Sequence, residues 1–368
     1  MLLWLSDTKR KIEHPRGLAA CQGGPMGVPR TMIAAVTLGH GGPEQTVVHT
    51  EWPCPQPAPG QTLVRVAAAA LNNTDIWSRA GAYGTATDPD AVVGWKGVPL
   101  EFPRIQGIDV AGEVAAVGSE ADVTWVGRRV LVDPSARYEN GLPADIVGSE
   151  VDGGFAQYHV CSIDQLHDVT NSPLSDAQLA CLPTSYGTAL GMIERAAIET
   201  GERVLVTGSS GGVGMAAIQL LVDRGCEEVA RTSPQHREFV AGLGVAEVSA
   251  RGDDEIDALD PVDAVVDVVG GDEFGALLDR LRDGGRLVAA GAIAGPVVAL
   301  DLRRLYLQQR RLIGSTMHTP EHFHRLAAIA VAGGVDPIVA ATYPLDEIAA
   351  AQERFVRHDF VGKLVLLP

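Results

Sequence analysis

A glycine-rich turn is the part of the sequence with the clearest chemical meaning. The segment Val206-Thr207-Gly208-Ser209-Ser210-Gly211-Gly212-Val213-Gly214 follows a short apolar stretch and opens an amphipathic one. Glycines at a strand-to-helix turn let the backbone approach a pyrophosphate, and the free N–H groups at the helix start point at the phosphates. We therefore predict a dinucleotide site that is made by Ser209, Ser210, Gly211, Gly212, Val213 and Gly214. A structural turn without a ligand is the alternative.

A second group of residues bears on which dinucleotide binds. The next predicted strand ends at Val229-Ala230-Arg231-Thr232-Ser233. An NAD-binding protein usually places Asp or Glu about twenty residues past the glycines, where the acid binds the ribose 2′-hydroxyl. Ser233 stands there instead, and the cationic or titratable residues nearby are Arg231, His236 and Arg237. This pattern favours a 2′-phosphate, and hence NADPH, although ordinary solvated surface charges are the alternative.

The elements that must position these residues change in character along the chain. Up to about Pro183, short apolar runs such as 62–66 and 129–132 alternate with glycine and proline, which predicts a small β-rich domain. Beyond it, runs that are apolar on both faces, such as 203–207 and 264–269, alternate with helical stretches. That alternation indicates a parallel sheet with helices on both sides. The final run, 363–366, is expected to rejoin the first domain.

Several motifs in a fixed order resemble the medium-chain dehydrogenase/reductase superfamily, specifically its zinc-lacking, quinone oxidoreductase-like branch. The motifs are Leu71-Asn72-Asn73-Thr74-Asp75, Gly107-Ile108-Asp109-Val110-Ala111-Gly112, Gly153-Gly154-Phe155-Ala156, the glycine turn, Asp267-Val268-Val269-Gly270-Gly271 and Gly362-Lys363. The resemblance implies an α/β chain with a GroES-like β-rich catalytic domain and a Rossmann domain with a doubly wound parallel sheet. We assign 1–31 to an N-terminal extension, 32–183 and 317–368 to the catalytic domain, and 184–316 to the NADP-binding domain. The further cofactor-binding residues that we expect are Val268, Val269, Gly291, Ala292 and Lys363.

The departures from the metal-using members of this superfamily concern zinc. Asn72 and Ile108 stand at the first and second ligand positions, and Cys181 lies near the third. One thiol cannot hold a catalytic zinc, so no metal is expected. The stretch 133–154, where a structural zinc lobe would lie, contains no cysteine. His318, Glu321, His322 and His324 resemble a ligand cluster, but Pro320 favours the start of a surface helix instead.

Without a metal, hydrogen-bond donors must polarise the substrate and supply a proton. In the reductases that this chain resembles, a tyrosine at the place of Tyr83 faces the nicotinamide, so Tyr83 is the expected donor. Asn72 and Thr74 are expected to orient substrate or ribose hydroxyls, and Tyr186 is a second candidate donor. Packing in the core or at the rim of the cleft is the alternative for either tyrosine.

The expected function is zinc-independent, NADPH-dependent hydride transfer to an activated C=C or C=O bond of a quinone, an enone or a biosynthetic ketone. A zinc-free alcohol dehydrogenase and a non-catalytic NADPH-binding protein stay open as alternatives.

The net charge of −17 argues against nucleic-acid and membrane partners. The apolar start, Met1 to Leu5, precedes its basic residues, which is the wrong order for a secretory signal and predicts a cytoplasmic location. An apolar edge strand near 311–315, together with the resemblance, predicts a homodimer.

Overall fold

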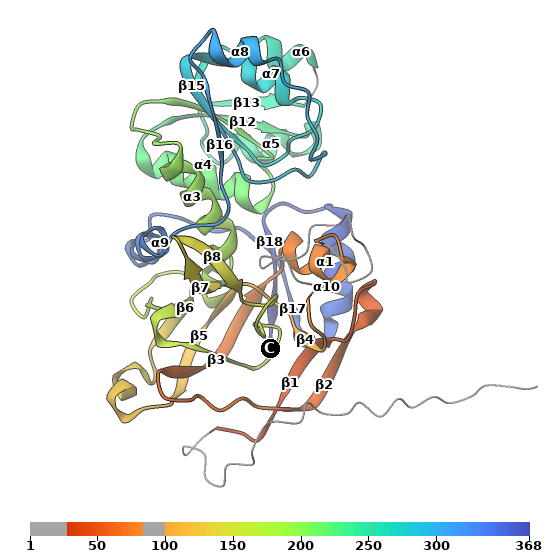
Figure 1. Cartoon of the computed structure of the whole chain (residues 1–368), viewed down its shortest axis with the longest axis vertical. Coiled ribbons are helices and arrows are strands. Elements are labelled where there is room, and N and C mark those ends of the chain that lie inside the picture. Colours follow the sequence, from red (N-terminus) through yellow and green to blue (C-terminus); the bar gives the residue numbers. More distant parts are fainter. Residues whose placement is uncertain (1–27, 84–99, 252) are drawn as a thin grey trace, which may run out of the picture.

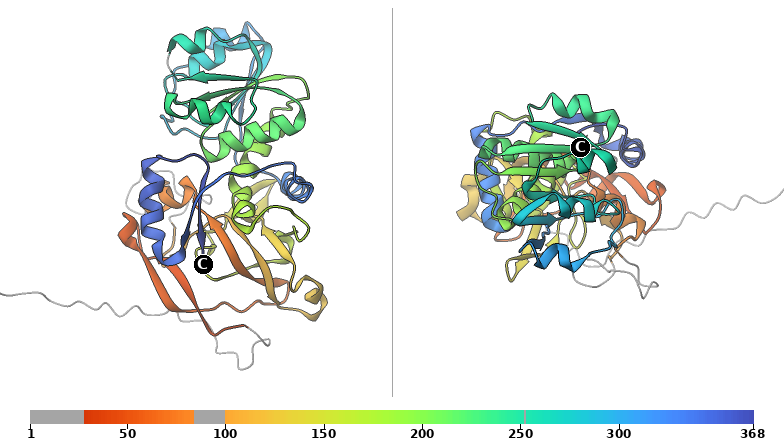
Figure 2. Two further views of the ribbon diagram at one scale, coloured as in Figure 1. Left: turned by 180° about the vertical axis from the view of Figure 1, so that it is seen from behind. Right: turned by 90° about the horizontal axis from the view of Figure 1, so that it is seen from above.

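Two stacked units make up the chain, of which the computed structural model describes residues 28–83, 100–251 and 253–368. The upper unit in Figure 1 contains the strands from β11 (Arg203–Thr207) to β16 (Arg311–Gly314), and the lower unit contains the segments before and after them. Figure 2 shows the same division from behind, with the C-terminus inside the lower unit. The expected extension, 1–31, lies outside the described residues as far as residue 27, and β1 begins at Thr31.

The upper unit is a six-stranded parallel sheet with helices between its strands. Its other strands are β12 (Glu227–Thr232), β13 (Glu247–Ala250), β14 (Val262–Asp267) and β15 (Leu281–Ala289), and its helices are α4 (Gly212–Arg224), α5 (Arg237–Ala241), α6 (Asp253–Asp257), α7 (Phe274–Asp279) and α8 (Leu302–Tyr306). The strand order is β13-β12-β11-β14-β15-β16. The chain order therefore reverses beside β11, and ligands bind at such a switch point in open α/β sheets.

The two faces of this sheet have separate apolar cores, which explains why its strands are apolar throughout. Val204 and Val206 of β11 pack with residues of α4 and of α3 (Gly187–Arg195). Leu205, between them, faces the other side and packs with Phe274 of α7. A parallel sheet that is covered on both faces is the doubly wound arrangement that the sequence predicted.

The lower unit is rich in β-structure, as expected. One sheet has the order β2-β1-β4, formed by β1 (Thr31–Thr37), β2 (Thr46–Pro53) and β4 (Arg104–Ile105). A second sheet contains, in spatial order, β10 (Leu166–Asp168), β6 (Arg129–Val132), β5 (Val110–Val117), β3 (Gln61–Ala70), β18 (Lys363–Leu367) and β17 (Val339–Pro344), and β9 (Tyr158–Ser162) also pairs with β3. Its helices are α1 (Asn73–Ala80), α2 (Asp176–Ala180), α9 (Pro320–Ala332) and α10 (Ile348–Arg357).

The last strand rejoins the lower unit, as the sequence predicted. β18 pairs antiparallel with β3 through Val365 and Ala70, and parallel with β17. Just before β18, the Gly362 N–H donates to the carbonyl oxygen of Ser210 in the glycine turn, at 3.5 Å. Lys363 therefore lies where the two units meet.

The stretch 133–154, where metal-using relatives would have a structural zinc lobe, contains a β-hairpin. β7 (Ser135–Glu139) and β8 (Leu142–Ile146) pair antiparallel. Asn140 and Gly141 form the connection with φ angles of 52° and 76°. Two left-handed residues are what the common two-residue hairpin turn requires, and Asn-Gly is its strongest sequence signal. That dipeptide could have revealed the hairpin.

Candidate functional site

The glycine turn places open backbone N–H groups at the start of α4. Gly211 caps this helix without a side-chain hydrogen bond, and Gly212 and Val213 in the first turn are partly exposed. A Cβ on Gly214 would lie 2.3 Å from the carbonyl oxygen of Gly208, so only glycine permits this close packing. The first N–H groups of a helix have no acceptor within it, and the helix dipole favours an anion there. The turn therefore fits the pyrophosphate of a dinucleotide.

The two serines of the turn differ in their surroundings. The hydroxyl of Ser209 is buried and donates to the carbonyl oxygen of Val206 at 2.8 Å. Ser210 is partly exposed. Ser209 therefore holds the turn in shape, whereas Ser210 is open to a ligand.

The residues that are expected beside the nicotinamide lie together at the carboxyl ends of β14 and β15. The Thr207 hydroxyl donates to the buried Asp267 carboxylate at 2.6 Å, and the Val269 N–H donates to the same carboxylate at 3.0 Å. These bonds hold the end of β14 beside the end of β11. A Cβ on Gly291 would lie 2.7 Å from the Val268 carbonyl oxygen, so β15 ends close by. The structure thus brings together Val268, Val269, Gly291 and Ala292.

Tyr83 follows α1 closely and faces the first turn of that helix. A hydrogen bond joins the side chains of Tyr83 and Thr74. The Tyr83 ring lies edge-on to Trp77, with 6.1 Å between the ring centroids. Burial raises the pKa of the Tyr83 phenol, and the bond with Thr74 opposes that rise. The phenol therefore keeps its proton at neutral pH, next to a second residue that the sequence had singled out.

Asn72 precedes this turn and has its side chain committed to other protein groups. Its Nδ2 donates to Asp109 Oδ2 at 2.8 Å and to the Ala70 carbonyl oxygen at 3.3 Å, and its Oδ1 accepts a hydrogen bond from Lys363 Nζ. Both amide hydrogens are thereby used. Asn72 therefore has no hydrogen left to donate to a substrate oxygen, and only the second lone pair of its Oδ1 could serve the predicted contact with substrate or ribose hydroxyls.

Lys363 points away from the glycine turn. Its Nζ donates to the Leu71 carbonyl oxygen at 2.7 Å and to Asn72 Oδ1 at 2.5 Å, and lies 3.5 Å from Asp109 Oδ2. We call these four residues (Leu71, Asn72, Asp109 and Lys363) the ammonium cluster. Only the methylene chain of Lys363 faces the turn, since a Cβ on Gly212 would lie 3.1 Å from its Cδ. The predicted cofactor contact of Lys363 could therefore come from its methylene chain and not from its ammonium.

Asp75 is buried next to the ammonium cluster. Its carboxylate accepts the Asn72 N–H at 2.8 Å and the Gly107 N–H at 3.2 Å. Burial raises the pKa of Asp75 to about 7, against the lowering effect of the Asn72 N–H, and the nearby Asp109 raises it further. This carboxyl group therefore changes its charge near neutral pH.

The residues at the zinc-ligand positions do not suit zinc. Ile108 is buried and packs with Ile146 and Met317, so apolar side chains fill the place of the imidazole. The Cys181 thiol donates to the Ala177 carbonyl oxygen at 3.2 Å, and burial raises its pKa to about 12. Zinc requires deprotonated thiolate ligands. Nowhere in the described ranges do three or more His, Cys, Asp or Glu residues gather in a way that could hold a metal ion.

His318 differs from its expected place on the surface. Its side chain is fully buried, and Nε2 lies 3.0 Å from Asp133 Oδ1. The other oxygen of Asp133 accepts the Tyr138 hydroxyl at 2.8 Å. α9 does begin at Pro320, with Thr319 as its N-cap, so the predicted helix start is confirmed. The surface location was wrong for His318, because the segment that crosses between the units packs it against the start of α3.

Tyr186 forms a tie between the units. Its ring is buried, and its hydroxyl donates to Gln219 Oε1 of α4 at 2.8 Å. Gln219 in turn donates to the carbonyl oxygen of Asp336 and accepts its N–H. These contacts favour a structural role for Tyr186 and leave Tyr83 as the better-placed donor.

Arg231 is fully occupied inside the protein. It is 1% exposed and makes two bonds to Glu273, at 2.8 and 3.1 Å. It also donates to the Ser249 hydroxyl and the Ala250 carbonyl oxygen, both at 2.8 Å. Binding a 2′-phosphate would require this buried ion pair to break, which is costly. We therefore correct the assignment of Arg231 as a cofactor ligand. Its partner Glu273 lies 42 residues away in the chain, so the local sequence did not reveal this ion pair.

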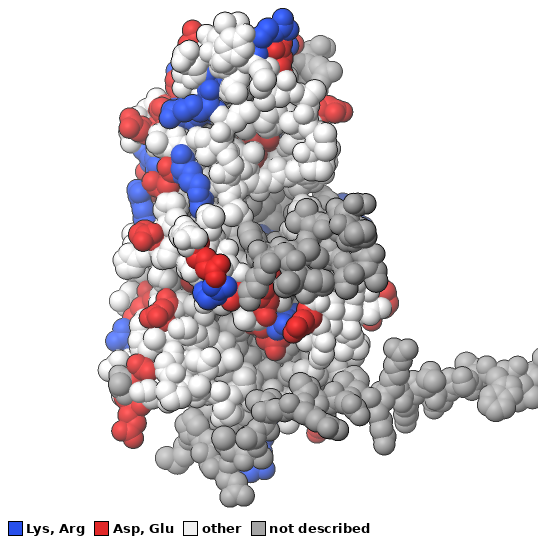
Figure 3. Space-filling model, viewed as in Figure 1, with Lys and Arg blue, Asp and Glu red and all other residues white. Residues whose placement is uncertain are grey.

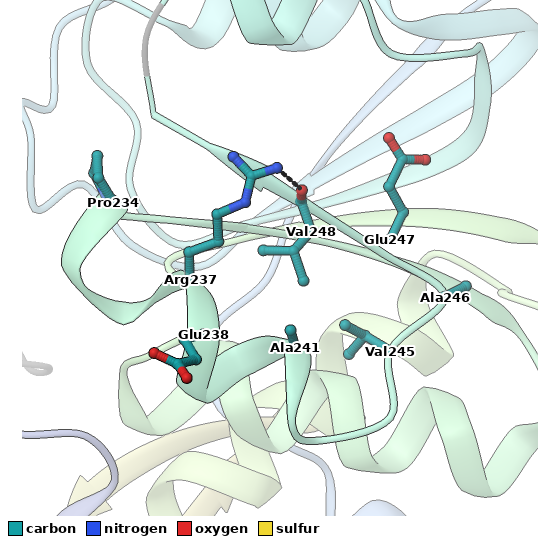
Figure 4. A pocket seen from close by; sticks show the side chains of 8 residues that line it. All are labelled: Pro234, Arg237, Glu238, Ala241, Val245, Ala246, Glu247 and Val248. Carbon is teal, nitrogen blue, oxygen red and sulfur yellow. Dashed lines mark hydrogen bonds between the residues drawn. The ribbon is translucent and has the colours of Figure 1, made fainter.

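Arg237 lines a shallow hollow of about 560 Å³ between α5 and β13 (Figure 4). Its guanidinium donates to the Val248 carbonyl oxygen at 3.3 Å and pairs with Glu255 at 3.3 Å. β13 is the edge strand, and β12 separates it from β11 and the glycine turn. The hollow therefore lies away from the glycine turn, and Arg237, which was predicted to bind the cofactor, is directed toward this hollow.

Ser233 and His236 lie at the end of β12 and stay candidates for contact with the 2′-phosphate. A third candidate, Arg251, was not predicted from the sequence. Thr232 is in register with Ala250 of β13, so Arg251 comes next at the same edge of the sheet. Its N–H donates to the Thr232 carbonyl oxygen at 2.9 Å. The Arg251 side chain is exposed and has no hydrogen bond or ion pair with the described residues. Arg251 was not predicted because its place follows from the register of β12 and β13, which the sequence does not show.

Two family models match the chain, one for each unit. "Alcohol dehydrogenase GroES-like domain" matches residues 58–171, and "Zinc-binding dehydrogenase" matches residues 212–332. Quinone oxidoreductase from Homo sapiens is 27% identical over 354 residues, with 92% of this chain and 98% of the relative covered. Acryloyl-coenzyme A reductase from Metallosphaera sedula is 28% identical over 350 residues, with 91% and 99% covered.

Solved structures agree over nearly the whole length. A protein from Sinorhizobium meliloti 1021 that is assigned as an alcohol dehydrogenase is 42% identical, with a TM-score of 0.86 and coverage of 93% of this chain and 98% of that one. A 2-octenoyl-CoA carboxylase reductase in complex with NADP and 2-octenoyl-CoA is 25% identical, with a TM-score of 0.78 and coverage of 92% and 88%. The chain therefore belongs to the medium-chain dehydrogenase/reductase superfamily of oxidoreductases.

Proposed function

We propose that this oxidoreductase is a zinc-independent, NADPH-dependent reductase that acts on an activated C=C or C=O bond of a quinone, an enone or a biosynthetic ketone. The single observation that supports this most is the hydrogen-bonded pair Tyr83–Thr74 beside the ammonium cluster. A protonated phenol is available there, whereas Ile108 and the neutral Cys181 thiol are not zinc ligands. Relatives named quinone oxidoreductase and acryloyl-coenzyme A reductase support this class of reaction.

Tyr83 is the proposed source of the proton. NADPH, when bound at the glycine turn, supplies the hydride. Because burial raises the pKa of Tyr83, the phenol keeps its proton until a strongly basic oxygen or carbon forms beside it. The bond with Thr74 then stabilises the phenolate, and the Trp77 ring shields one side of the phenol from water.

The preference for NADPH is proposed from the end of β12. No Asp or Glu follows this strand directly, and Ser233, His236 and Arg251 lie there. A guanidinium forms paired, charge-assisted hydrogen bonds with a phosphate. The solved relative that holds NADP adds support.

Oxidation of an alcohol is the second candidate, which the 42% identity to a protein assigned as an alcohol dehydrogenase favours. Tyr83 would then have to accept the proton of the alcohol. Its raised pKa leaves little phenolate at neutral pH to do so. The chemistry of this phenol therefore favours reduction.

The test follows NADPH absorbance with quinones, enones, aldehydes and ketones, and NADP⁺ reduction with alcohols. Turnover of quinones or enones with NADPH, faster than any alcohol oxidation, is the expected result. Faster alcohol oxidation would replace the proposal with the second candidate. Tight NADPH binding without turnover across the panel would indicate a non-catalytic protein.

A homodimer is also proposed, joined along β16. This strand is at the edge of its sheet, and α8 and the loop before it expose large apolar side chains nearby. They are Val297, Leu302, Tyr306 and Leu307, which are 89%, 61%, 59% and 68% exposed. A bare apolar edge invites pairing, and a symmetric partner would cover it. Light scattering at micromolar concentration should give the dimer mass, and Leu307→Asp should give the monomer mass; a wild-type monomer would refute the interface.

Small molecules and a second copy are the proposed partners. Acidic and basic side chains are interspersed on the face shown in Figure 3, and the net charge of −17 also disfavours a nucleic-acid partner, which would require a basic patch. Along the described chain, every helix is too short or too polar to cross a bilayer. The cytoplasmic location stays a prediction.

A further inference from the structure

Lysine is scarce in this chain, and one lysine is buried between the two units. The sequence has 29 Lys and Arg residues, of which only Lys9, Lys11, Lys96 and Lys363 are lysines. The first three lie outside the described residues. Lys363 is 6% exposed, whereas arginine supplies the cation in most other ion pairs of the described chain. A lysine at this buried position therefore calls for a chemical reason.

The acceptors around Lys363 match an ammonium group. The Leu71 carbonyl oxygen, Asn72 Oδ1 and Asp109 Oδ2 approach Nζ at 2.7, 2.5 and 3.5 Å. An ammonium is a compact charge with three donors; two of its hydrogens bond to the Leu71 and Asn72 oxygens, and the Asp109 carboxylate is its ion-pair partner. A guanidinium is planar and has five donors, so three oxygens around one point do not suit it.

The same cluster occupies the place where metal-using relatives hold their zinc. Asn72 stands at the first ligand position, and Asp109 follows Ile108, which stands at the second. Cys181, near the third position, interacts electrostatically with Lys363. Of the three ligand positions, the first thus bonds to the ammonium of Lys363 and the third interacts with it electrostatically, whereas Ile108 at the second packs with Ile146 and Met317.

We propose that the Lys363 ammonium supplies, between the two units, the positive charge that a metal supplies in metal-using relatives. It positions Asn72 and, through Asn72, the first turn of α1 with Thr74 and Tyr83. Lys363 is a positioning residue, because its buried ammonium bonds to Leu71 and Asn72 and pairs with Asp109. The kinetic part of this inference rests on the proposed reductase function.

Contacts on the other side of the cluster explain how it would align α1 with the cofactor domain. Asp109 Oδ1 accepts the N–H of Thr184, just before α3, at 2.8 Å. The Gly362 N–H donates to Ser210 in the glycine turn, and the Lys363 methylene chain lies against Gly212. The cluster therefore contacts both units. Its contacts lie within a few residues of the glycine turn, where NADPH is expected, and of α1, which precedes the proposed proton donor Tyr83.

The test separates this role from that of a cofactor ligand. In Lys363→Met, kcat at saturating NADPH should fall roughly 10- to 100-fold, the loss typical when an orienting group is removed. The Kd for NADPH should stay within about threefold, because the ammonium faces away from the glycine turn. Lys363→Arg should restore little of the loss, because of its planar head. An NADPH Kd raised at least about tenfold with unchanged kcat, or unchanged values of both, would overturn the proposal.

Hydrogen exchange supplies a measurement that does not depend on turnover. The amides of Asn72 and Gly107, both bonded to Asp75, should exchange faster in Lys363→Met, whereas the first turn of α4 should not change. Unchanged exchange of these two amides would overturn the proposal even if no substrate is found. Absence of turnover in the wild type, by contrast, would count only against the proposed reductase.

A matched variant controls for the general cost of removing a buried cation. Arg286 bonds to Glu202 and to the carbonyl oxygens of Ala196 and Ala197, far from α1 in the sequence. Arg286→Met should lower Tm without faster exchange in α1. If Lys363→Met does not fold, Lys363→Gln, which keeps a hydrogen-bond donor, takes its place with the same readouts and the same deciding outcomes.

Discussion

The glycine turn lies against the methylene chain of Lys363, and the ammonium cluster surrounds the Nζ of the same residue. The two regions differ in how they are assembled. The turn is local: it spans seven residues, 208–214, and leaves the first backbone N–H groups of α4 open to a ligand. The cluster is assembled from chain segments as far apart as Leu71 and Lys363, 292 residues, and its polar groups are buried against one another. Binding of the cofactor and placement of the proton donor therefore depend on different kinds of contact.

This difference predicts that the two functions can be separated. Changes at the end of β12 or in the turn should alter cofactor affinity. Changes around α1 should alter turnover or stability and leave cofactor affinity nearly as it is.

Tyr83→Phe should lower kcat roughly 10²- to 10⁴-fold, because a general acid typically contributes that much. The Kd for NADPH should change less than about twofold, since Tyr83 does not belong to the cofactor domain. Steady-state kinetics and fluorescence titration check both values. Tyr186→Phe is the matched control: its hydroxyl bonds to Gln219, so it should lose about 1 kcal/mol of stability and keep its turnover. Near-normal turnover of Tyr83→Phe would show that the proton comes from elsewhere.

Arg251→Ala should weaken NADPH binding roughly 10- to 150-fold, which corresponds to a charge-assisted contact of about 1.5–3 kcal/mol. NADH, which lacks the 2′-phosphate, should bind as before. Arg231→Ala should instead lower the free energy of unfolding by about 3–5 kcal/mol, because it leaves Glu273 without its buried partner. Titration with both cofactors decides the matter, and an equal loss for NADPH and NADH would exclude a 2′-phosphate contact by Arg251.

Asp75→Asn should flatten the dependence of stability on pH. Burial raises the folded-state pKa of Asp75 to about 7 from its ordinary value of 3.8, so the folded protein holds this proton more strongly than the unfolded chain. The wild type should therefore lose stability as pH rises from about 4 to about 7. Denaturant titrations at pH 5 and pH 8 should show a smaller difference in the variant. The exposed Asp164→Asn is the control, and an equal difference in wild type and Asp75→Asn would contradict this account.

A chelator should leave activity unchanged, because neither Ile108 nor the protonated Cys181 thiol suits zinc. Elemental analysis of the active protein provides the independent measurement. About one zinc per chain, with activity that disappears on its removal and returns on its addition, would contradict the zinc-independent mechanism.

Local patterns in the sequence were sufficient for the glycine turn and for several of the strands. Gly214 marks the close approach of α4 to β11, and the doubly apolar run from Arg203 to Thr207 marks a strand that is buried on both faces. The C-terminal strand was equally evident from its apolar run. Such features were predictable because hydrophobic period and glycine geometry act over a few residues.

Long-range contacts decided which polar side chains are available for chemistry. Arg231 was expected to bind a phosphate, but Glu273 holds it inside the protein. Asn72 was expected to face the substrate, but Asp109 and Lys363 use its amide. Arg251 became a candidate only because the register of β13 places it beside the end of β12. Which polar groups are present, and which local backbone forms around them, followed from the amino-acid sequence. Their partners depended on the tertiary structure, because a buried polar group must bond to whatever distant segment the fold brings within about 3 Å.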